Sequence, residues 1–396
     1  MIALVIYALV AAAAVYLAAS AVGWLRAFAD APSWSGLLRG GLNVALFLWF
    51  LYWARDNTWS IPDDGRMGID GRIYFRAAQA WLAGGDPWLA GVAINGFRFD
   101  FAGPPPTVLV FAPFALLQED WFNVLWLGLG LGAALYTLHR LRLPFWWLAF
   151  PPLAQAVMVG NPQVVCMAVL VSGSDWLRAL AVPFKAYAAL PMLAEMRWRA
   201  IAILATACAV SVLLWSGTWL TYLGEFSAIS SRLAAESFGG FSATRDPRLL
   251  AITALAVVAL AAVDLRAAGW LAVPALWPAS QFFYSEFALP VITPLFAAVL
   301  AAGGHPADAV APWAVVAYSA WRVGRHIQAR APSLLAMTRG SPPRAAVASL
   351  ADPRTGTNPA LDPQPRVRTQ PPRGTGFPRQ ASTTRTDQDE DHERPT

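Results

Sequence analysis

Long apolar runs separated by short polar or charged stretches make up most of this 396-residue chain. Nine runs reach or approach the length of a membrane-spanning helix, and residues 309–321 form a weaker candidate. The nine runs are 2–24, 38–54, 121–138, 144–159, 163–174, 198–214, 249–263, 267–279 and 287–302. The first has no positively charged start and exceeds the apolar core of a signal peptide, so we expect a retained anchor. The pattern therefore predicts an all-α fold, a polytopic transmembrane helical bundle with about 9–11 membrane segments.

Basic residues in the short loops give the expected orientation, because short loops rich in Lys and Arg stay in the cytoplasm. The residues expected on that side are Arg26, Arg39, His139, Arg140, Arg142, Arg178, Arg197, Arg199 and Arg266. Alternation of the segments then places 55–120, 160–163, 215–248 and 280–286 at the outer face. The longest of these, 55–120, is predicted to be an extracytoplasmic loop.

Polar residues are densest in this first outer loop. A helix that starts near Asp70 would end at the Gly84-Gly85 pair, because glycine commonly follows the last turn of a helix. Two interpretations of Asp70 stay open: it caps the helix N-terminus, or its carboxylate acts as a general base at the membrane surface. Helical spacing puts a single stripe of side chains on one face: Asp70, Tyr74, Ala77 and Trp81.

Lys185 is the only lysine of the chain and lies in an apolar stretch, 179–195. That stretch contains Pro183 and Pro191 and is flanked by arginines, which favours a re-entrant hairpin of two short helices with Lys185 near its tip. Broken helices at membrane depth are tolerated where they are buried or line a cavity. Two interpretations of this single lysine stay open. It is present by chance in a chain that otherwise uses arginine, or its ammonium binds a phosphate group.

Two further polar islands interrupt apolar runs. Gly160-Asn-Pro-Gln163 is either a tight outer turn or a pair of amides that bind sugar hydroxyls, since an amide both donates and accepts hydrogen bonds. The second island, residues 277–286, contains Gln281, Tyr284, Ser285 and Glu286. These polar groups cannot all face lipid without an energetic penalty. The segment is therefore either a loop at the membrane surface whose polar groups are hydrogen-bonded, or the wall of a cavity.

Composition supports the membrane class: the chain is 57% hydrophobic and 13% charged, with 19 tryptophans. Residues 322–396 hold 12 Arg against 7 Asp and Glu, which accounts for the net charge of +5. The net positive charge of the chain is therefore no argument for nucleic-acid binding. The two cysteines lie in apolar runs and the four histidines are scattered, so no disulfide framework or metal site is indicated. We expect a catalytic domain over 1–325 and a disordered Pro/Arg-rich tail over 326–396.

The islands lie far apart in the sequence, yet one orientation places them together at the outer face with Lys185 directed toward them. The loop motifs "AAQAWLAGGDPW" and "FRFDFAGPPPTVLVFAPFALL", after Asp70 and Tyr74, resemble the first extracytoplasmic loop of glycosyltransferase family 87. The later "VGNPQ", "AVPFKAYAALPML" and "WPASQFFYSEFALP" follow in the order of that family. This chain differs in exchanging the two amides of the usual Gly-Gln-x-Asn and in having Trp88 where a tyrosine is expected.

The resemblance implies a fold of the GT-C superfamily and a polyprenyl-phosphate-dependent mannosyltransferase of the plasma membrane, with an actinobacterial cell envelope as the setting. The partners implied are the bilayer, a polyprenyl-phosphate sugar donor and a glycolipid or lipoglycan acceptor, and neither a cofactor nor a metal is required. Asp70 would be the catalytic base, and Lys185 would stabilise the leaving phosphate. The expected substrate-binding residues are Arg72, Tyr74, Trp81, Asn161, Gln163, Gln281, Tyr284 and Glu286. The alternatives are a transporter or flippase of lipid-linked sugars and a non-catalytic membrane scaffold.

Overall fold

The computed structural model describes residues 15, 34–58, 60–94, 96–236, 241–278, 280–304 and 309–338. The predicted first segment, 2–24, lies outside these residues except for Val15, and so does the chain from 339 onward. The described part from 34 to 338 belongs to one compact unit.

This unit is mostly helical, which confirms the all-α prediction in its coarse form. The longer helices are α2 (Trp34–Thr58), α4 (Ile69–Leu82), α6 (Glu119–Arg140), α11 (Trp198–Leu214), α12 (Ser216–Glu236), α13 (Pro247–Val263), α14 (Leu265–Leu276) and α16 (Val310–Thr338). The shorter ones are α3 (Ser60–Asp63), α5 (Pro105–Phe111), α7 (Pro151–Met158), α8 (Gln163–Leu170), α9 (Asp175–Phe184), α10 (Ala189–Ala194) and α15 (Pro294–Ala301). Turns of 3₁₀-helix are η1 (Pro87–Leu89), η2 (Phe114–Leu116), η3 (Phe145–Ala149), η4 (Ala186–Ala188), η5 (Ala243–Arg245) and η6 (Phe282–Val291).

Helix lengths do not confirm the predicted 9–11 membrane segments. Among the described residues, α6 alone is long and apolar enough to cross a bilayer, and three crossings result if each of two bent helix pairs counts as one. The pairs are α7 with α8, bent by 118°, and α11 with α12, bent by 101°. The apolar runs 144–159 and 163–174 each hold a helix of 8 residues, about 12 Å long at 1.5 Å per residue. Neither reaches the roughly 30 Å of a hydrocarbon core by itself.

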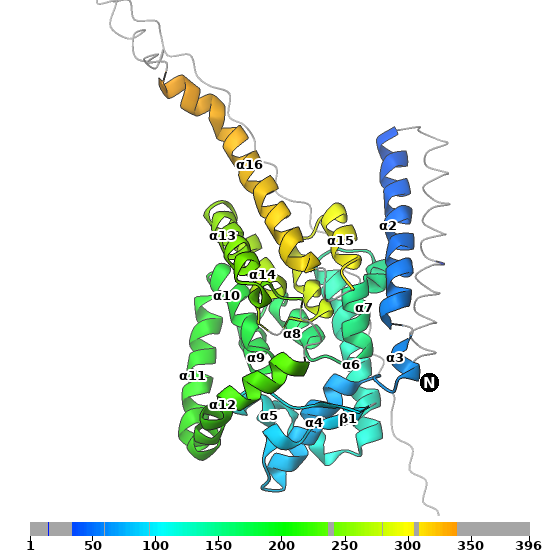
Figure 1. Ribbon diagram of the computed structural model, residues 1–396, viewed down its shortest axis with the longest axis vertical. Coiled ribbons are helices and arrows are strands. Elements are labelled where there is room, and N and C mark those ends of the chain that lie inside the picture. Colours follow the sequence, from blue (N-terminus) through cyan, green and yellow to red (C-terminus); the bar gives the residue numbers. More distant parts are fainter. Residues whose placement is uncertain are drawn as a thin grey trace, which may run out of the picture. The chain divides into compact units, whose positions relative to one another are not determined.

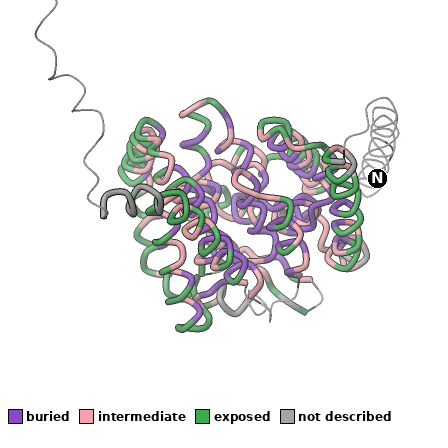
Figure 2. The backbone as a smooth tube through the Cα atoms, turned by 90° about the horizontal axis from the view of Figure 1, so that it is seen from above, coloured by how far each residue is buried: buried purple, intermediate pink, exposed green. Residues whose placement is uncertain are grey.

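Large apolar side chains face outward on many of the helices. Figure 2 shows buried residues inside the unit and exposed residues on the outer sides of its peripheral helices. The exposed apolar residues include Leu38, Leu48, Leu125, Leu129, Leu213, Leu214, Leu220, Leu223, Leu255 and Val258. An outer surface of this kind is unusual for a protein surrounded by water.

The predicted outer loop is folded and mainly helical. Its elements α4, α5 and β1 lie together at the lower end of the unit in Figure 1. Helix α4 begins and ends as predicted, from Ile69 to Leu82, just before Gly84. The loop also contains a small antiparallel hairpin of β1 (Val92–Ile94) and β2 (Phe97–Phe99), which the sequence analysis missed.

The chain breaks at Lys185, as predicted. Helix α9 ends at Phe184, Lys185 takes an extended conformation with φ −151° and ψ 114°, and η4 and α10 follow. The predicted tail needs a correction at its start, because α16 continues through residues 326–338 to Thr338. Its helical hydrogen bonding extends beyond the end at 325 that composition indicated.

Candidate active site

Asp70 lies in the first turn of α4, where this helix contacts the end of α7. The backbone N–H groups of Gly68 and Asp70 donate to the carbonyls of Met158 and Val159, both at 2.9 Å. Gly68 is the N-cap residue of α4, and no side chain caps the helix. The capping interpretation of Asp70 is therefore wrong, since its carboxylate does not bond its own helix end.

Small residues allow this close approach of two chain segments. Gly68 and Gly160 both have positive φ, 69° and 67°. A Cβ atom on Gly160 would lie 3.1 Å from the Gly68 Cα atom, and one on Gly68 would lie 1.8 Å from Asn123 Oδ1. The Trp126 indole fixes the same turn by donating to the Gly160 carbonyl at 2.7 Å. A side chain at Gly160 would press on the backbone before α4, and one at Gly68 would displace the Asn123 side chain on α6.

The amide of Asn161 orients the Asp70 carboxylate. Its Nδ2 atom donates to Asp70 Oδ2 at 2.5 Å, and its Oδ1 atom accepts from the backbone N–H of Gln163 at 2.9 Å. Because Oδ1 is held by a donor, Nδ2 is the end that points to the carboxylate. Gly160–Gln163 is thus both a tight turn and a hydrogen-bonding platform for Asp70.

Gln163 connects this turn to two other segments. Its Nε2 atom donates to the Phe283 carbonyl in η6 at 2.8 Å, and its Oε1 atom accepts from the Tyr187 hydroxyl in η4 at 2.6 Å. The residue is fully buried. Since both ends of the amide bond protein groups, Gln163 positions Tyr187 and η6, and one N–H of its Nε2 atom is left over from these two bonds.

The Lys185 ammonium lies between aromatic faces. Its Nζ atom is 5.3 Å from the ring centroid of Tyr74 and 5.9 Å from that of Tyr284, within the range of cation–π attraction. Within the described part of the chain it has no ion pair and no hydrogen bond from its Nζ atom. An ammonium carries three donors, so Lys185 keeps a strong capacity to bind an anion.

The charge of Lys185 affects the pKa of two carboxyl groups. Burial raises the pKa of Asp70 above its ordinary value of 3.8, and this rise is opposed by the Lys185 charge and the Asn161 hydrogen bond. Burial also raises the pKa of Glu286, which is 0% exposed in η6, and Lys185 again acts in the opposite direction. A carboxylate with a raised pKa is a stronger base than an exposed one once it is deprotonated.

The structure thus brings together most of the predicted site residues. We call this group the Asp70–Lys185 cluster; it consists of Asp70, Tyr74, Asn161, Gln163, Lys185, Tyr187, Tyr284 and Glu286. Tyr187 is a member that the sequence analysis missed. Its position two residues after Lys185, at the break between α9 and α10, was the available signal.

Three predicted residues are not brought to Lys185 by any contact. Arg72 lies on another face of α4, because residues i and i+2 of a helix point in different directions. Its Nη2 atom donates to the Gly65 carbonyl at 2.8 Å, and its predicted role in substrate binding stays a prediction. Trp81 is half-buried and packs against the hydrophobic core. Gln281 precedes η6, where its backbone carbonyl accepts from Tyr284 N at 3.0 Å.

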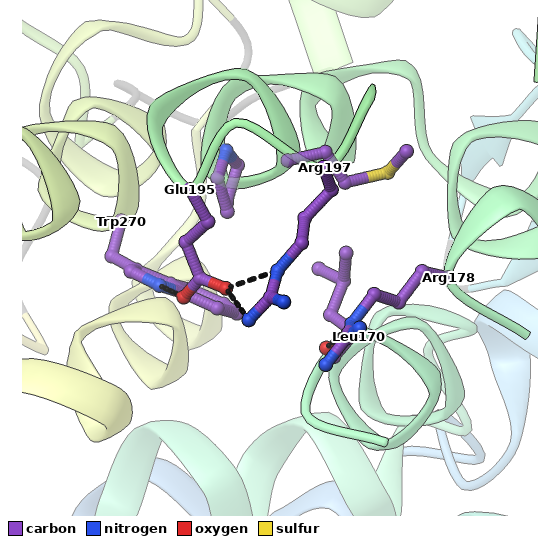
Figure 3. A pocket seen from close by; sticks show the side chains of 7 residues that line it. Leu170, Arg178, Glu195, Arg197 and Trp270 are labelled. Carbon is purple, nitrogen blue, oxygen red and sulfur yellow. Dashed lines mark hydrogen bonds and ion pairs between the residues drawn. The ribbon is translucent and has the colours of Figure 1, made fainter. Parts of the chain in front are cut away.

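A separate charged group holds α10 against α14 (Figure 3). Glu195 accepts hydrogen bonds from the side chains of Arg197 at 3.0 Å, Arg266 at 3.1 Å and Trp270 at 3.0 Å. Glu195, Arg197 and Trp270 line a small pocket, and Arg178 lines it as well. Two arginines that the sequence analysis expects in the cytoplasm, Arg197 and Arg266, therefore meet at Glu195, directly after α10.

Replacing Glu195 with Ala should lower the melting temperature of the protein in detergent. Trp270 is 2% exposed, and its indole N–H would lose its acceptor. Leaving a buried donor unsatisfied costs about 1–3 kcal/mol. Glu225→Ala on α12, which removes a partly exposed glutamate, is the matched control and should change the melting temperature little. An equal effect of the two substitutions would contradict the role of Glu195 in holding α10 against α14.

Comparisons of the chain with protein-family models, with curated proteins and with solved structures find no match. Among the described residues, no three His, Cys, Asp or Glu side chains gather as a metal site would require. The chemistry of the Asp70–Lys185 cluster is therefore the basis for assigning a function.

Proposed function

We propose that this protein is an integral-membrane glycosyltransferase of GT-C type. It would move a sugar, most simply mannose, from a polyprenyl-phosphate donor to a lipid or lipoglycan acceptor at the outer face of the plasma membrane. The observation that carries the proposal is the convergence of Asp70, held by Asn161, with the Lys185 ammonium, which has no ion pair among the described residues. A base and a phosphate-binding cation in one cluster are what transfer from a lipid phosphate needs.

A membrane location is supported by α6 and by the outward-facing apolar side chains. Leu213, Leu214, Leu220 and Leu255 are each at least 65% exposed, and lipid would cover them at no cost. We include in the proposal a polytopic bundle in which the bent pair α7–α8 lines the site and α4, α5 and η1 form the outer loop. Broken helices suit such a place, because their free backbone groups need a polar cavity.

The proposed reaction is a single displacement with inversion at the anomeric carbon. The acceptor hydroxyl attacks C1 of the donor sugar while its proton passes to Asp70. As the new C1–O bond forms, the bond between C1 and the phosphate oxygen breaks, and both of its electrons go to the polyprenyl phosphate. Lys185 stabilises the charge that develops on this leaving group in a site of low dielectric. A β-linked donor would give an α-glycoside.

Incubation of membranes with labelled polyprenyl-phosphate-mannose tests the proposal. We expect a new labelled glycolipid when the protein is present and none when it is absent. A transporter would move the label across the membrane without forming a bond, and a scaffold would do neither. Either of these outcomes would contradict the proposed glycosyltransferase function.

The rate should fall on the acid side at a higher pH than an exposed aspartate would give. Asp70 must be deprotonated to act as base, and burial raises its pKa. The acid limb of the kcat/KM profile therefore shifts to higher pH. Asn161→Ala removes a hydrogen bond that favours the charged form. The pKa should then rise further and shift the limb to still higher pH.

Measurement of kcat/KM against pH for wild type and Asn161→Ala checks this. Gln79→Ala, which removes an exposed amide on α4, should leave the acid limb in place. An Asn161→Ala limb that is unchanged or lies at lower pH would contradict the orienting role of Asn161.

A further inference from the structure

Glu286 is the most deeply buried acidic group in the described part of the chain that lacks a partner. It is 0% exposed, and neither carboxyl oxygen has a hydrogen-bond partner among the described residues. The Gln163 amide and the Lys185 charge both lower the pKa of Glu286, so Glu286 belongs to the Asp70–Lys185 cluster. An ionised carboxylate without partners is very costly in such surroundings, so the neutral acid is the stable form.

The cluster itself does not satisfy Glu286. The Gln163 amide bonds the Phe283 carbonyl and the Tyr187 hydroxyl. The Lys185 ammonium lies over Tyr74 and Tyr284 and is not within ion-pair distance of any described carboxylate. The Gln163 amide lowers the pKa of Glu286 from nearby, but neither carboxyl oxygen makes a hydrogen bond of ordinary geometry with a described residue. A neutral carboxylic acid offers one O–H donor and free acceptor positions, so Glu286 keeps capacity for a ligand.

We propose that Glu286, in its neutral form, binds two hydroxyl groups of the donor sugar, donating to one and accepting from the other. This inference rests on the proposed function and assigns the sugar-recognising residue of the same site. The cluster would then have an anion-binding end at Lys185 and a hydroxyl-binding end at Glu286. A carboxyl group disfavours a second phosphate at its end, so the expected ligand there is neutral and polyhydroxylated.

The test compares two substitutions of Glu286. Glu286→Gln keeps a neutral donor and acceptor, whereas Glu286→Met keeps the length and removes both. The KM for polyprenyl-phosphate-mannose should rise at least about tenfold in Glu286→Met and stay within about threefold in Glu286→Gln. The inhibition constant of polyprenyl phosphate, which lacks the sugar, should change little in either variant. Glu225→Gln is the matched control, and its KM should equal that of wild type.

Deoxy-mannosyl donors give a second measurement that needs no variant. Wild type should discriminate against the donor that lacks a bound hydroxyl, and Glu286→Met should not. An unchanged donor KM in Glu286→Met, or no discrimination among deoxy donors by wild type, would overturn the inference. So would a Glu286→Gln variant as impaired as Glu286→Met, since Glu286 would then act as a charged partner of Lys185. Absence of glycolipid formation by wild type would instead remove the proposed function itself.

Discussion

Asp70→Asn should reduce glycolipid formation by about 10²–10⁴-fold, the usual contribution of a general base. The amide has nearly the shape of the carboxylate and can still accept from Asn161, so the contact between α4 and the turn before α8 is kept. What is lost is the ability to take a proton from the acceptor hydroxyl. Initial rates of transfer by purified variant and wild type, at saturating donor, measure the effect.

Asp120→Asn is the matched control for this substitution. Asp120 is exposed in the first turn of α6, close to the outer loop in sequence but outside the cluster. We expect wild-type transfer from it and wild-type folding from both variants, judged by size-exclusion behaviour and melting temperature. Near-normal transfer by a folded Asp70→Asn variant would remove Asp70 from the mechanism.

Lys185→Met should lower kcat by about 10²–10³-fold, as loss of one preorganised group at a developing charge commonly does. Methionine fills the space between Tyr74 and Tyr284 but leaves the phosphate without a cation. Because the ammonium also binds the product, inhibition by polyprenyl phosphate should weaken in the same variant. Lys185→Arg should restore part of the rate, since it keeps the charge and changes its geometry.

The single lysine gives this prediction an independent readout. An amine-reactive reagent has Lys185 as its only side-chain target, so mass spectrometry can follow its modification. Polyprenyl phosphate should protect Lys185 from the reagent. A Lys185→Met variant with normal kcat, or a lysine whose modification is insensitive to polyprenyl phosphate, would contradict its role.

The sequence predicted those parts of the site that depend on local signals. Gly84-Gly85 marks the end of α4, and the prolines around Lys185 mark the break between α9 and α10, because these residues act on the backbone at their own positions. Convergence of the islands followed from assigning them to one face of the membrane. Each of these steps needs only neighbouring residues and the sign of nearby charges.

The remaining features depend on tertiary contacts or on signals that were overlooked. The position of a bend cannot be read from an apolar run: 144–159 and 163–174 predict two spans, whereas the structure has two short helices, α7 and α8, bent by 118° relative to each other. The face of α4 that packs on α6 decides where Arg72 points, and the side chain bonds the Gly65 carbonyl. The hairpin was predictable, because Asn-Gly at 95–96 is a typical sequence signal for a hairpin turn, and Gly96 has φ 80°.

A structure of the Asp70→Asn variant with bound polyprenyl-phosphate-mannose is the most direct test of the central claim. We predict the phosphate in contact with the Lys185 ammonium and the sugar between this phosphate and Glu286, with C1 facing residue 70. A donor bound elsewhere, or one whose phosphate is held by other residues while Lys185 stays over its tyrosines, would contradict the account.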